Sequence, residues 1–137
     1  MPPELSDVVR LRIVKAEHDL EAARRIMAVP EGCPYDTVCF HCRQAVEKYL
    51  KALLTQLAIS APRTHDLEVL LKLLPSNSGL SVAVEALVEL NPYAVQSRYT
   101  DDWVAVELDD AHRAFAVAHQ VRRDVLALLP RESNPSL

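Results

Sequence analysis

The residues from Cys39 to Leu57 alternate between apolar and polar positions with the period of an α-helix. At about 100° per residue, most of their apolar side chains fall in one arc that covers roughly half of the helix. The arc consists of Cys39, Cys42, Ala45, Val46, Tyr49, Leu50, Ala52, Leu53, Leu54 and Leu57. One neighbouring helix cannot cover so wide an arc, so the pattern predicts the central helix of a bundle. The opposite side is polar apart from Phe40, which indicates that this side faces something other than bulk water.

Apolar residues recur at helical spacing in five segments of the chain. These are residues 6–28, 36–57, 64–74, 81–90 and 108–129. Ser6 and Thr64 are good N-cap residues, and we expect them to begin the first and third helices. Asn91-Pro92 is expected to end the fourth helix, because the residue before a proline disfavours the helical conformation. Residues 93–107 show no sustained period and are predicted to form a loop.

The composition favours helices over sheets. Half of the 137 residues are hydrophobic and only two are glycine, and the chain is long enough to bury a core. Long apolar seams joined by short turns are typical of an antiparallel bundle. We therefore predict an all-α fold, an up-and-down helical bundle of about five helices. It is expected to form a single domain over residues 1–137, with residues 130–137 as a frayed tail.

Charge and cysteine content narrow the functions that the chain can have. The net charge of −4 argues against a general nucleic-acid coat protein, whose binding depends on neutralising phosphates, but it permits a local basic pocket. No apolar run reaches the roughly 18 residues of a membrane span, and the first residues do not resemble a signal peptide. We therefore expect a cytoplasmic protein without membrane contact. Three cysteines, an odd number, do not suggest a disulfide framework.

The polar side of the second predicted helix holds the first candidate site. Its residues are Arg43, Gln44, Glu47, Lys48 and Lys51. The three cations are suited to contact phosphate, and Gln44 is suited to hydrogen-bond a base or a sugar. No Gly-rich phosphate loop accompanies them, so side chains would have to hold any nucleotide. The alternative is an ordinary helix surface, since Glu47 and Lys51 form a common i,i+4 pair.

Two further sets of candidates lie outside that helix. His65 is predicted in the first turn of the third helix, where the positive end of the helix favours a neutral imidazole able to hydrogen-bond. Its alternative role is to pack or to help cap that helix. Arg98, Tyr99, Asp101 and Asp102 lie in the non-periodic segment, and such loops often carry function. Their alternative role is a structural Arg–Asp pair.

The Cys39-Phe40-His41-Cys42 run, with Cys33 upstream, has a superficial likeness to a zinc site. Cys39 and Cys42 share a helix face, but that face is the apolar arc, and His41 points elsewhere. We interpret the cysteines as small buried helix residues and expect no metal and no other cofactor.

Five segments of the chain carry a recognisable combination of residues. The second predicted helix contains Phe40, Gln44, Glu47-Lys48, Lys51-Ala52 and Leu54. The others are Ala16, Asp19-Leu20 and Ala23 in the first helix, Thr64-His65-Asp66-Leu67, Arg98-Tyr99-Thr100-Asp101, and Ala111 to Ala118 in the last helix. Together these segments resemble the HEPN domain family (higher eukaryotes and prokaryotes nucleotide-binding), with residues 98–101 as its Arg-Tyr-x-Asp element. The matches occur in the family's order and cover nearly the whole chain.

The resemblance implies a partner and a binding site. Proteins of this family are commonly encoded beside a minimal nucleotidyltransferase and act as its partner, often as toxin–antitoxin pairs. It implies that Lys48, Lys51, His65 and Arg98 lie near one cleft, which binds a nucleotide or RNA. The full set of expected binding residues is Arg43, Gln44, Glu47, Lys48, Lys51, His65, Arg98, Tyr99 and Asp101. Phe40, Trp103 and the wide apolar arc support a homodimer.

Many members of the family resemble metal-independent ribonucleases, in which an arginine is followed four to six residues later by a histidine. After Arg98 the next histidine is His112, which is too far along the chain. Arg113 and His119 fit the spacing, but six residues within one regular helix place them about 120° apart. We interpret that match as coincidence and favour a non-catalytic binding partner. The alternatives are a ribonuclease at a dimer interface that uses Arg98 with His65 or His112, and a purely structural dimeric adaptor.

Overall fold

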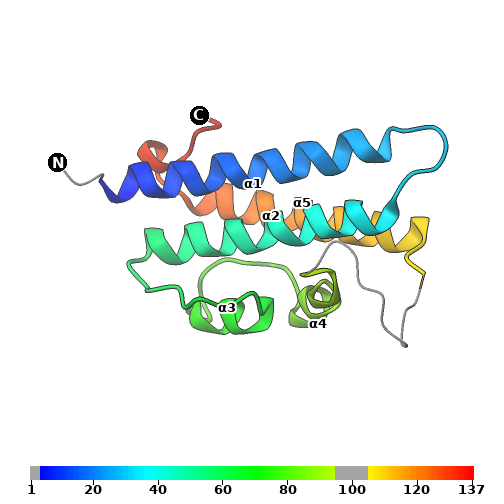
Figure 1. Ribbon diagram of the computed structural model, residues 1–137. Helices are drawn as coiled ribbons and strands as arrows, with labels where there is room; N and C mark the ends of the chain where they lie inside the picture. The colour runs from blue at the N-terminus through cyan, green and yellow to red at the C-terminus, as the bar shows by residue number, and fades with distance from the viewer. Residues whose placement is uncertain (1–3, 95–104) are drawn as a thin grey trace.

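Three long helices lie side by side, and two short helices lie along one side of them (Figure 1). The computed structural model describes residues 4–94 and 105–137. The long helices are α1 (Leu5–Met27), α2 (Tyr35–Gln56) and α5 (Leu108–Leu128), and the short ones are α3 (Leu67–Leu73) and α4 (Val84–Val88). Two 3-10 turns, η1 (Asn91–Ala94) and η2 (Arg131–Ser133), follow α4 and α5. No strand occurs in these residues, and the predicted all-α bundle is confirmed.

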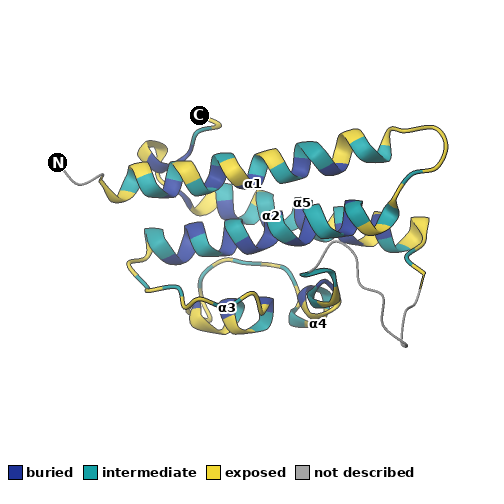
Figure 2. Ribbon diagram, viewed as in Figure 1, coloured by how far each residue is buried: buried dark blue, intermediate teal, exposed yellow. Residues whose placement is uncertain are grey.

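Helix α2 is the centre of the bundle. It packs against α1 and α5 and, on another side, against α3 and η1. Figure 2 shows buried residues along most of its length, whereas α1 and α5 carry exposed outer stripes. Every residue of the predicted arc is buried except Leu57, which is 44% exposed because α2 ends at Gln56. The width of the apolar arc therefore accounts for the number of neighbours that α2 has.

Helices α1 and α5 bury single seams against α2. The buried residues are Val9, Ile13, Ala16, Leu20 and Ala23 in α1, and Ala111, Ala114, Ala118, Val121 and Val125 in α5. Leu128, the last residue of α5, is 38% exposed and does not belong to the second seam. It covers Gly79 instead, where an added Cβ would lie 2.9 Å from Leu128 Cδ2. Gly79 has a φ of +96°, so its backbone conformation favours glycine, whereas the end of the flexible Leu128 side chain can shift to relieve this contact.

Two of the predicted caps differ in the structure. Helix α1 begins at Leu5 with Glu4 as its N-cap, rather than at Ser6, and no side chain caps it. Helix α3 begins at Leu67, and its cap is Asp66, not Thr64. The Asp66 carboxylate accepts a hydrogen bond from a backbone N–H of the first turn. The Thr64 hydroxyl accepts one from the Asp66 N–H at 3.1 Å, so it orders the residues just before the helix.

The region after α3 is less helical than the sequence predicts. Helix α4 spans only five residues, compared with the expected 81–90. Asn91-Pro92 does not end the ordered structure but begins η1. Proline fits the first turn of a helix, because its fixed φ is already helical and its missing N–H has no partner there anyway.

The C-terminal residues fold back onto the bundle, contrary to the expected frayed tail. Ser133 and Asn134 are 1% and 3% exposed. The Ser133 hydroxyl donates to Gln56 Oε1 at 2.6 Å, and Asn134 Nδ2 donates to the Leu126 carbonyl at 3.0 Å. These bonds hold η2 beside the end of α2 and the start of α1.

Candidate functional site

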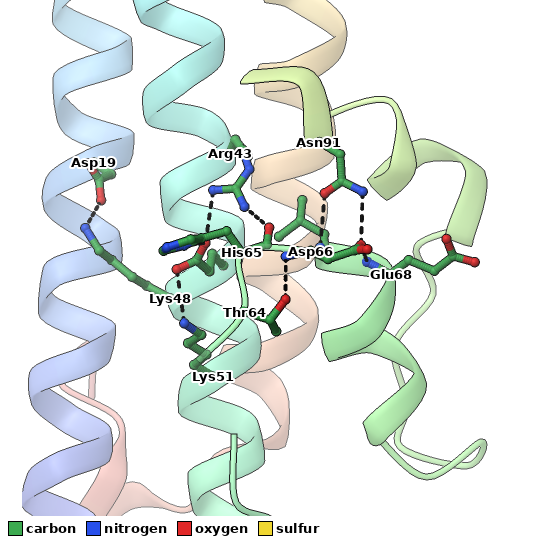
Figure 3. Close-up of polar contacts among 11 residues, drawn as sticks. Asp19, Arg43, Lys48, Lys51, Thr64, His65, Asp66, Glu68 and Asn91 are labelled. Atoms are coloured by element: carbon green, nitrogen blue, oxygen red, sulfur yellow. Dashed lines mark hydrogen bonds and ion pairs between the residues drawn. The ribbon is translucent and has the colours of Figure 1, made fainter. Parts of the chain in front are cut away.

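A buried carboxylate organises the polar side of α2. Arg43, Glu47 and Lys51 follow one another at i, i+4 and i+8, so they form a row along one face of the helix. Arg43 Nη1 lies 3.0 Å from Glu47 Oε1, and Lys51 Nζ lies 3.2 Å from Oε2. His65, from the segment before α3, brings its Nδ1 to 3.0 Å from Glu47 Oε1. We call these four residues the Glu47 cluster, and Figure 3 labels Arg43, Lys51 and His65 among them.

Arg43 ties that cluster to the chain leading into α3. Its guanidinium is fully buried, and its Nη2 donates to the His65 carbonyl. We expected Arg43 to offer a cation to phosphate, but burial removes it from the surface. Its position instead fixes the backbone of the segment that carries His65. A charge-assisted bond of this kind is stronger than one between neutral groups.

The Glu47 carboxyl is ionised despite its burial. Desolvation alone would raise its pKa. The hydrogen bonds from His65 and Lys51, together with the charges of Lys51 and Arg43, outweigh desolvation and hold the pKa of Glu47 below its ordinary value. The sequence suggested an exposed i,i+4 pair here, whereas Glu47 is only 6% exposed.

His65 combines a fixed contact with an exposed ring. Its side chain is 75% exposed, although Nδ1 faces the buried Glu47. Helix α3 is capped by Asp66, so His65 lies just before the helix. The predicted position in the first turn of the helix is therefore wrong. The carboxylate orients the imidazole, and most of the ring remains open to solvent.

A second carboxylate holds the other candidate lysine. Lys48 Nζ pairs with Asp19 of α1, and His41 Nδ1 lies 2.9 Å from the other Asp19 oxygen. Lys48 remains 36% exposed at its side chain, and Gln44 is half-buried on the same helix. Asp19 therefore joins α1 and α2 and restrains Lys48 without enclosing it.

Arg98, Tyr99, Asp101, Asp102 and Trp103 lie outside the described residues. Among the candidates that the structure describes, four are in contact, namely Arg43, Glu47, Lys51 and His65. Lys48 and Gln44 also lie on α2.

The helix-embedded pair Arg113 and His119 does not converge. Arg113 pairs with Asp110 at 2.5 Å and lines a cavity of about 420 Å³ with Tyr93. His119 instead packs against Phe115, with 4.5 Å between ring centroids. Burial first, and then the charge of Arg122, lower the pKa of His119. The two residues face different neighbours, as their spacing predicts.

The cysteines lie where the apolar arc places them. Cys39 and Cys42 are fully buried, and burial raises their pKa values to about 11 and about 12. Within residues 4–94 and 105–137, no group of three or more His, Cys, Asp or Glu side chains is arranged to hold a metal ion. No helix in that part of the chain is both long and apolar enough to cross a membrane.

One polar junction between the long helices is not evident from the apolar pattern of the sequence. The Tyr49 hydroxyl donates to Glu17 Oε1 at 2.6 Å, and Arg122 Nε donates to the same oxygen at 2.7 Å. The contact links α1, α2 and α5. Tyr49 falls in the apolar arc of α2, but a buried tyrosine hydroxyl needs a hydrogen-bond partner. That hydroxyl is the sequence feature that indicates the junction.

Comparison with known proteins identifies the family. A family model described as HEPN domain matches residues 9–128. Among solved structures, the crystal structure of TT1696 from Thermus thermophilus is similar, with a TM-score of 0.72 and 27% sequence identity. The match covers 88% of this chain and 98% of that one. A search of curated proteins found no match. Because the family model spans most of its length, the chain belongs to the HEPN domain family.

Proposed function

We propose that this protein is a non-catalytic nucleotide- or RNA-binding partner of a minimal nucleotidyltransferase, in a toxin–antitoxin-like pair, and that it works as a homodimer. The observation that carries the proposal is the convergence of Lys51 and His65 on the buried Glu47 carboxylate. Family membership supports it, because the resemblance of the chain to this family implies such a partner.

The cluster supports binding because its polar groups are held in place before a ligand arrives. Arg43 fixes the backbone at His65, and Glu47 orients the imidazole, so little side-chain freedom is lost on binding. Lys48 lies one helical turn from Lys51 and is partly exposed, so it can contact a phosphate. In this proposal Gln44 hydrogen-bonds a base or sugar, and Arg98, Tyr99 and Asp101, which lie outside the described residues, belong to the same site.

Ribonuclease activity is the second candidate function. It is favoured by His65, whose exposed imidazole is oriented by a buried carboxylate, an arrangement suited to proton transfer. Two observations weigh against it. No histidine follows Arg98 within four to six residues. Arg113 and His119, which have the required spacing, face different neighbours.

Binding and cleavage can be tested together. Fluorescence anisotropy with a labelled short oligouridine should show weak binding that salt weakens and that a Lys48→Ala/Arg98→Ala double variant abolishes. The matched control is Arg25→Ala/Lys72→Ala, which removes two exposed cations elsewhere and should leave binding unchanged. We expect no RNA cleavage in EDTA.

The other outcomes identify the alternatives. Metal-free cleavage that disappears in Arg98→Ala would establish the ribonuclease. Cleavage lost in Arg113→Ala or His119→Ala would show that the helix-embedded pair is catalytic. Binding that survives the Lys48→Ala/Arg98→Ala change, without cleavage, would leave the structural dimeric adaptor as the remaining function. A small nucleotidyltransferase encoded in the neighbouring reading frame would support the proposed partnership, and its co-purification with this protein would test it directly.

A further inference from the structure

A basic cavity lies between α1 and α2, beside the polar side of α2. Its volume is about 280 Å³, and it is lined by Val8, Leu11, Arg12, Lys15 and Lys48. The four α1 residues follow at i, i+3, i+4 and i+7, which places them on one face of the helix. Three of the five lining residues are cations and none is acidic. We call this the α1–α2 cavity.

The positive charge of this cavity is only partly compensated. Lys48 pairs with Asp19. Arg12 and Lys15 form no ion pair with any residue in the described part of the chain, although the whole protein has a net charge of −4. A local excess of cations on an acidic protein attracts an anion to that place rather than to the surface in general.

Arg12 provides a second, independent observation. Its Nε is buried and finds no hydrogen-bond acceptor among residues 4–94 and 105–137. A buried N–H without an acceptor is costly and uncommon in proteins, so it calls for an explanation. Because this Nε is inaccessible to solvent, an anionic oxygen in the cavity would accept from it once the guanidinium turned toward the cavity. Guanidinium groups bind phosphate with two parallel N–H donors, a geometry that a lysine cannot supply.

We propose that the α1–α2 cavity is a phosphate-binding subsite for a nucleotide or for the backbone of RNA. Arg12 and Lys15 bind the phosphate, and Lys48 completes the site from α2. Leu11, which is 59% exposed, provides an apolar wall for the sugar or base. This inference deepens the proposed function and rests on it for the identity of the ligand. Lys48 connects the subsite to the Glu47 cluster, because Lys51 lies one turn further along α2.

The Nε–H signal of Arg12 in nuclear magnetic resonance spectra tests the subsite directly. Adenosine 5′-monophosphate and pyrophosphate should each shift this signal. Adenosine, which has no phosphate, and sodium chloride at matched ionic strength should not. In parallel, an Arg12→Gln/Lys15→Gln variant should bind labelled oligouridine about tenfold more weakly. The slope of its log binding constant against log salt concentration should be smaller by about one to two.

Two further variants control for general effects of charge and folding. Arg24→Gln/Lys72→Gln makes the same charge change at exposed positions. It should alter binding by less than about twofold, because salt screens charges that lie far from the ligand. Arg12→Lys keeps the charge but removes the guanidinium fork. It should bind more weakly than the wild type and more strongly than Arg12→Gln. Circular dichroism checks that each variant is folded.

The possible results separate this inference from the function on which it rests. RNA binding that is unaffected by Arg12→Gln/Lys15→Gln, with an unmoved Arg12 signal, would overturn the subsite and leave the proposed function standing. A signal that moves with pyrophosphate, in a protein that binds neither the nucleotide nor RNA, would support the phosphate subsite and overturn the proposed function. An Arg12 signal that moves equally with sodium chloride would overturn the subsite.

Discussion

At the scale of single residues, Glu47 has the most influence on the candidate site. Its carboxylate is nearly inaccessible, yet it contacts two cations and one imidazole. Without it, the buried guanidinium of Arg43 would lose its anionic partner. An unpaired buried charge is among the most destabilising features a protein can acquire. Glu47 therefore supports both the stability of the fold and the position of His65.

We expect Glu47→Gln to lower the free energy of unfolding by about 3–5 kcal/mol, the range for a buried ion pair that loses one partner. Urea unfolding measures this change. The control is Glu68→Gln, which breaks the exposed Glu68–Lys72 pair and should cost less than about 1 kcal/mol. Equal losses in the two variants would mean that the Glu47 cluster is not a structural centre.

The same residue predicts a dependence of stability on pH. The pKa of Glu47 is lower in the folded protein than its ordinary value of 4.5. Its contribution to stability is therefore complete above about pH 4.5 and is lost as the pH falls through the lower folded value. Unfolding curves measured across this range should show a smaller acid-induced loss for Glu47→Gln than for the wild type. Parallel losses would contradict the assignment.

The buried cysteines predict an absence of metal chemistry. The thiolate is the metal ligand, and burial raises the pKa of both Cys39 and Cys42 far above neutral pH. A Cys39→Ala/Cys42→Ala variant should lose roughly 1 kcal/mol of stability per site and show no change in metal content. Elemental analysis of the purified protein is the measurement. Stoichiometric zinc that disappears in the variant would refute this interpretation.

At the scale of elements, η1 holds the start of α3. Asn91 Oδ1 accepts a hydrogen bond from the Leu67 N–H at 3.0 Å, and its Nδ2 donates to Asp66 Oδ1 at 3.1 Å. One side chain therefore satisfies the first N–H of α3 and braces its N-cap (Figure 3). A helix of seven residues depends on such contacts, because isolated short helices are unstable.

Replacing Asn91 with Ala should therefore cost about 1–3 kcal/mol, because it leaves the Leu67 N–H without its acceptor. Chemical unfolding gives the total loss, and the resonances of α3 show where it occurs. Asn77→Ala, at an exposed turn position, is the matched control and should be nearly neutral. A cost no larger than that of the control would show that η1 does not hold α3.

The sequence predicts the long helices better than it predicts the polar contacts between elements. The apolar period of α2 is visible over many residues, so its central position could be inferred. Caps are harder to predict, because Thr64 and Asp66 are both capable of capping α3 and only the local backbone selects one of them. Arg43 and Glu47 both contact His65, which is distant in sequence, and no periodicity within α2 reveals that partner.

At the scale of the whole molecule, we expect a homodimer at micromolar concentration. Phe40 lies among polar residues on α2 and is only partly buried, which suits an interface with a second copy. Analytical ultracentrifugation should give twice the chain mass of 15.3 kDa. Phe40→Glu should shift the protein toward monomer, and Lys72→Glu, on an exposed face of α3, should not. A wild-type monomer at that concentration would remove the argument for a site at a dimer interface.

The central position of α2 also determines how the backbone opens to solvent. Because α1, α5, α3 and η1 all cover this helix, its amides cannot meet water unless several neighbours separate together. Amide hydrogens in the middle of α2 should therefore exchange with deuterium only through global unfolding, whereas those of the five-residue α4 should exchange through local opening. Residues that position His65 thus belong to the most slowly opening part of the chain. The α2 residues of the Glu47 cluster should therefore keep their positions through local fluctuations, whereas the contact of Glu47 with His65 depends on the segment before α3.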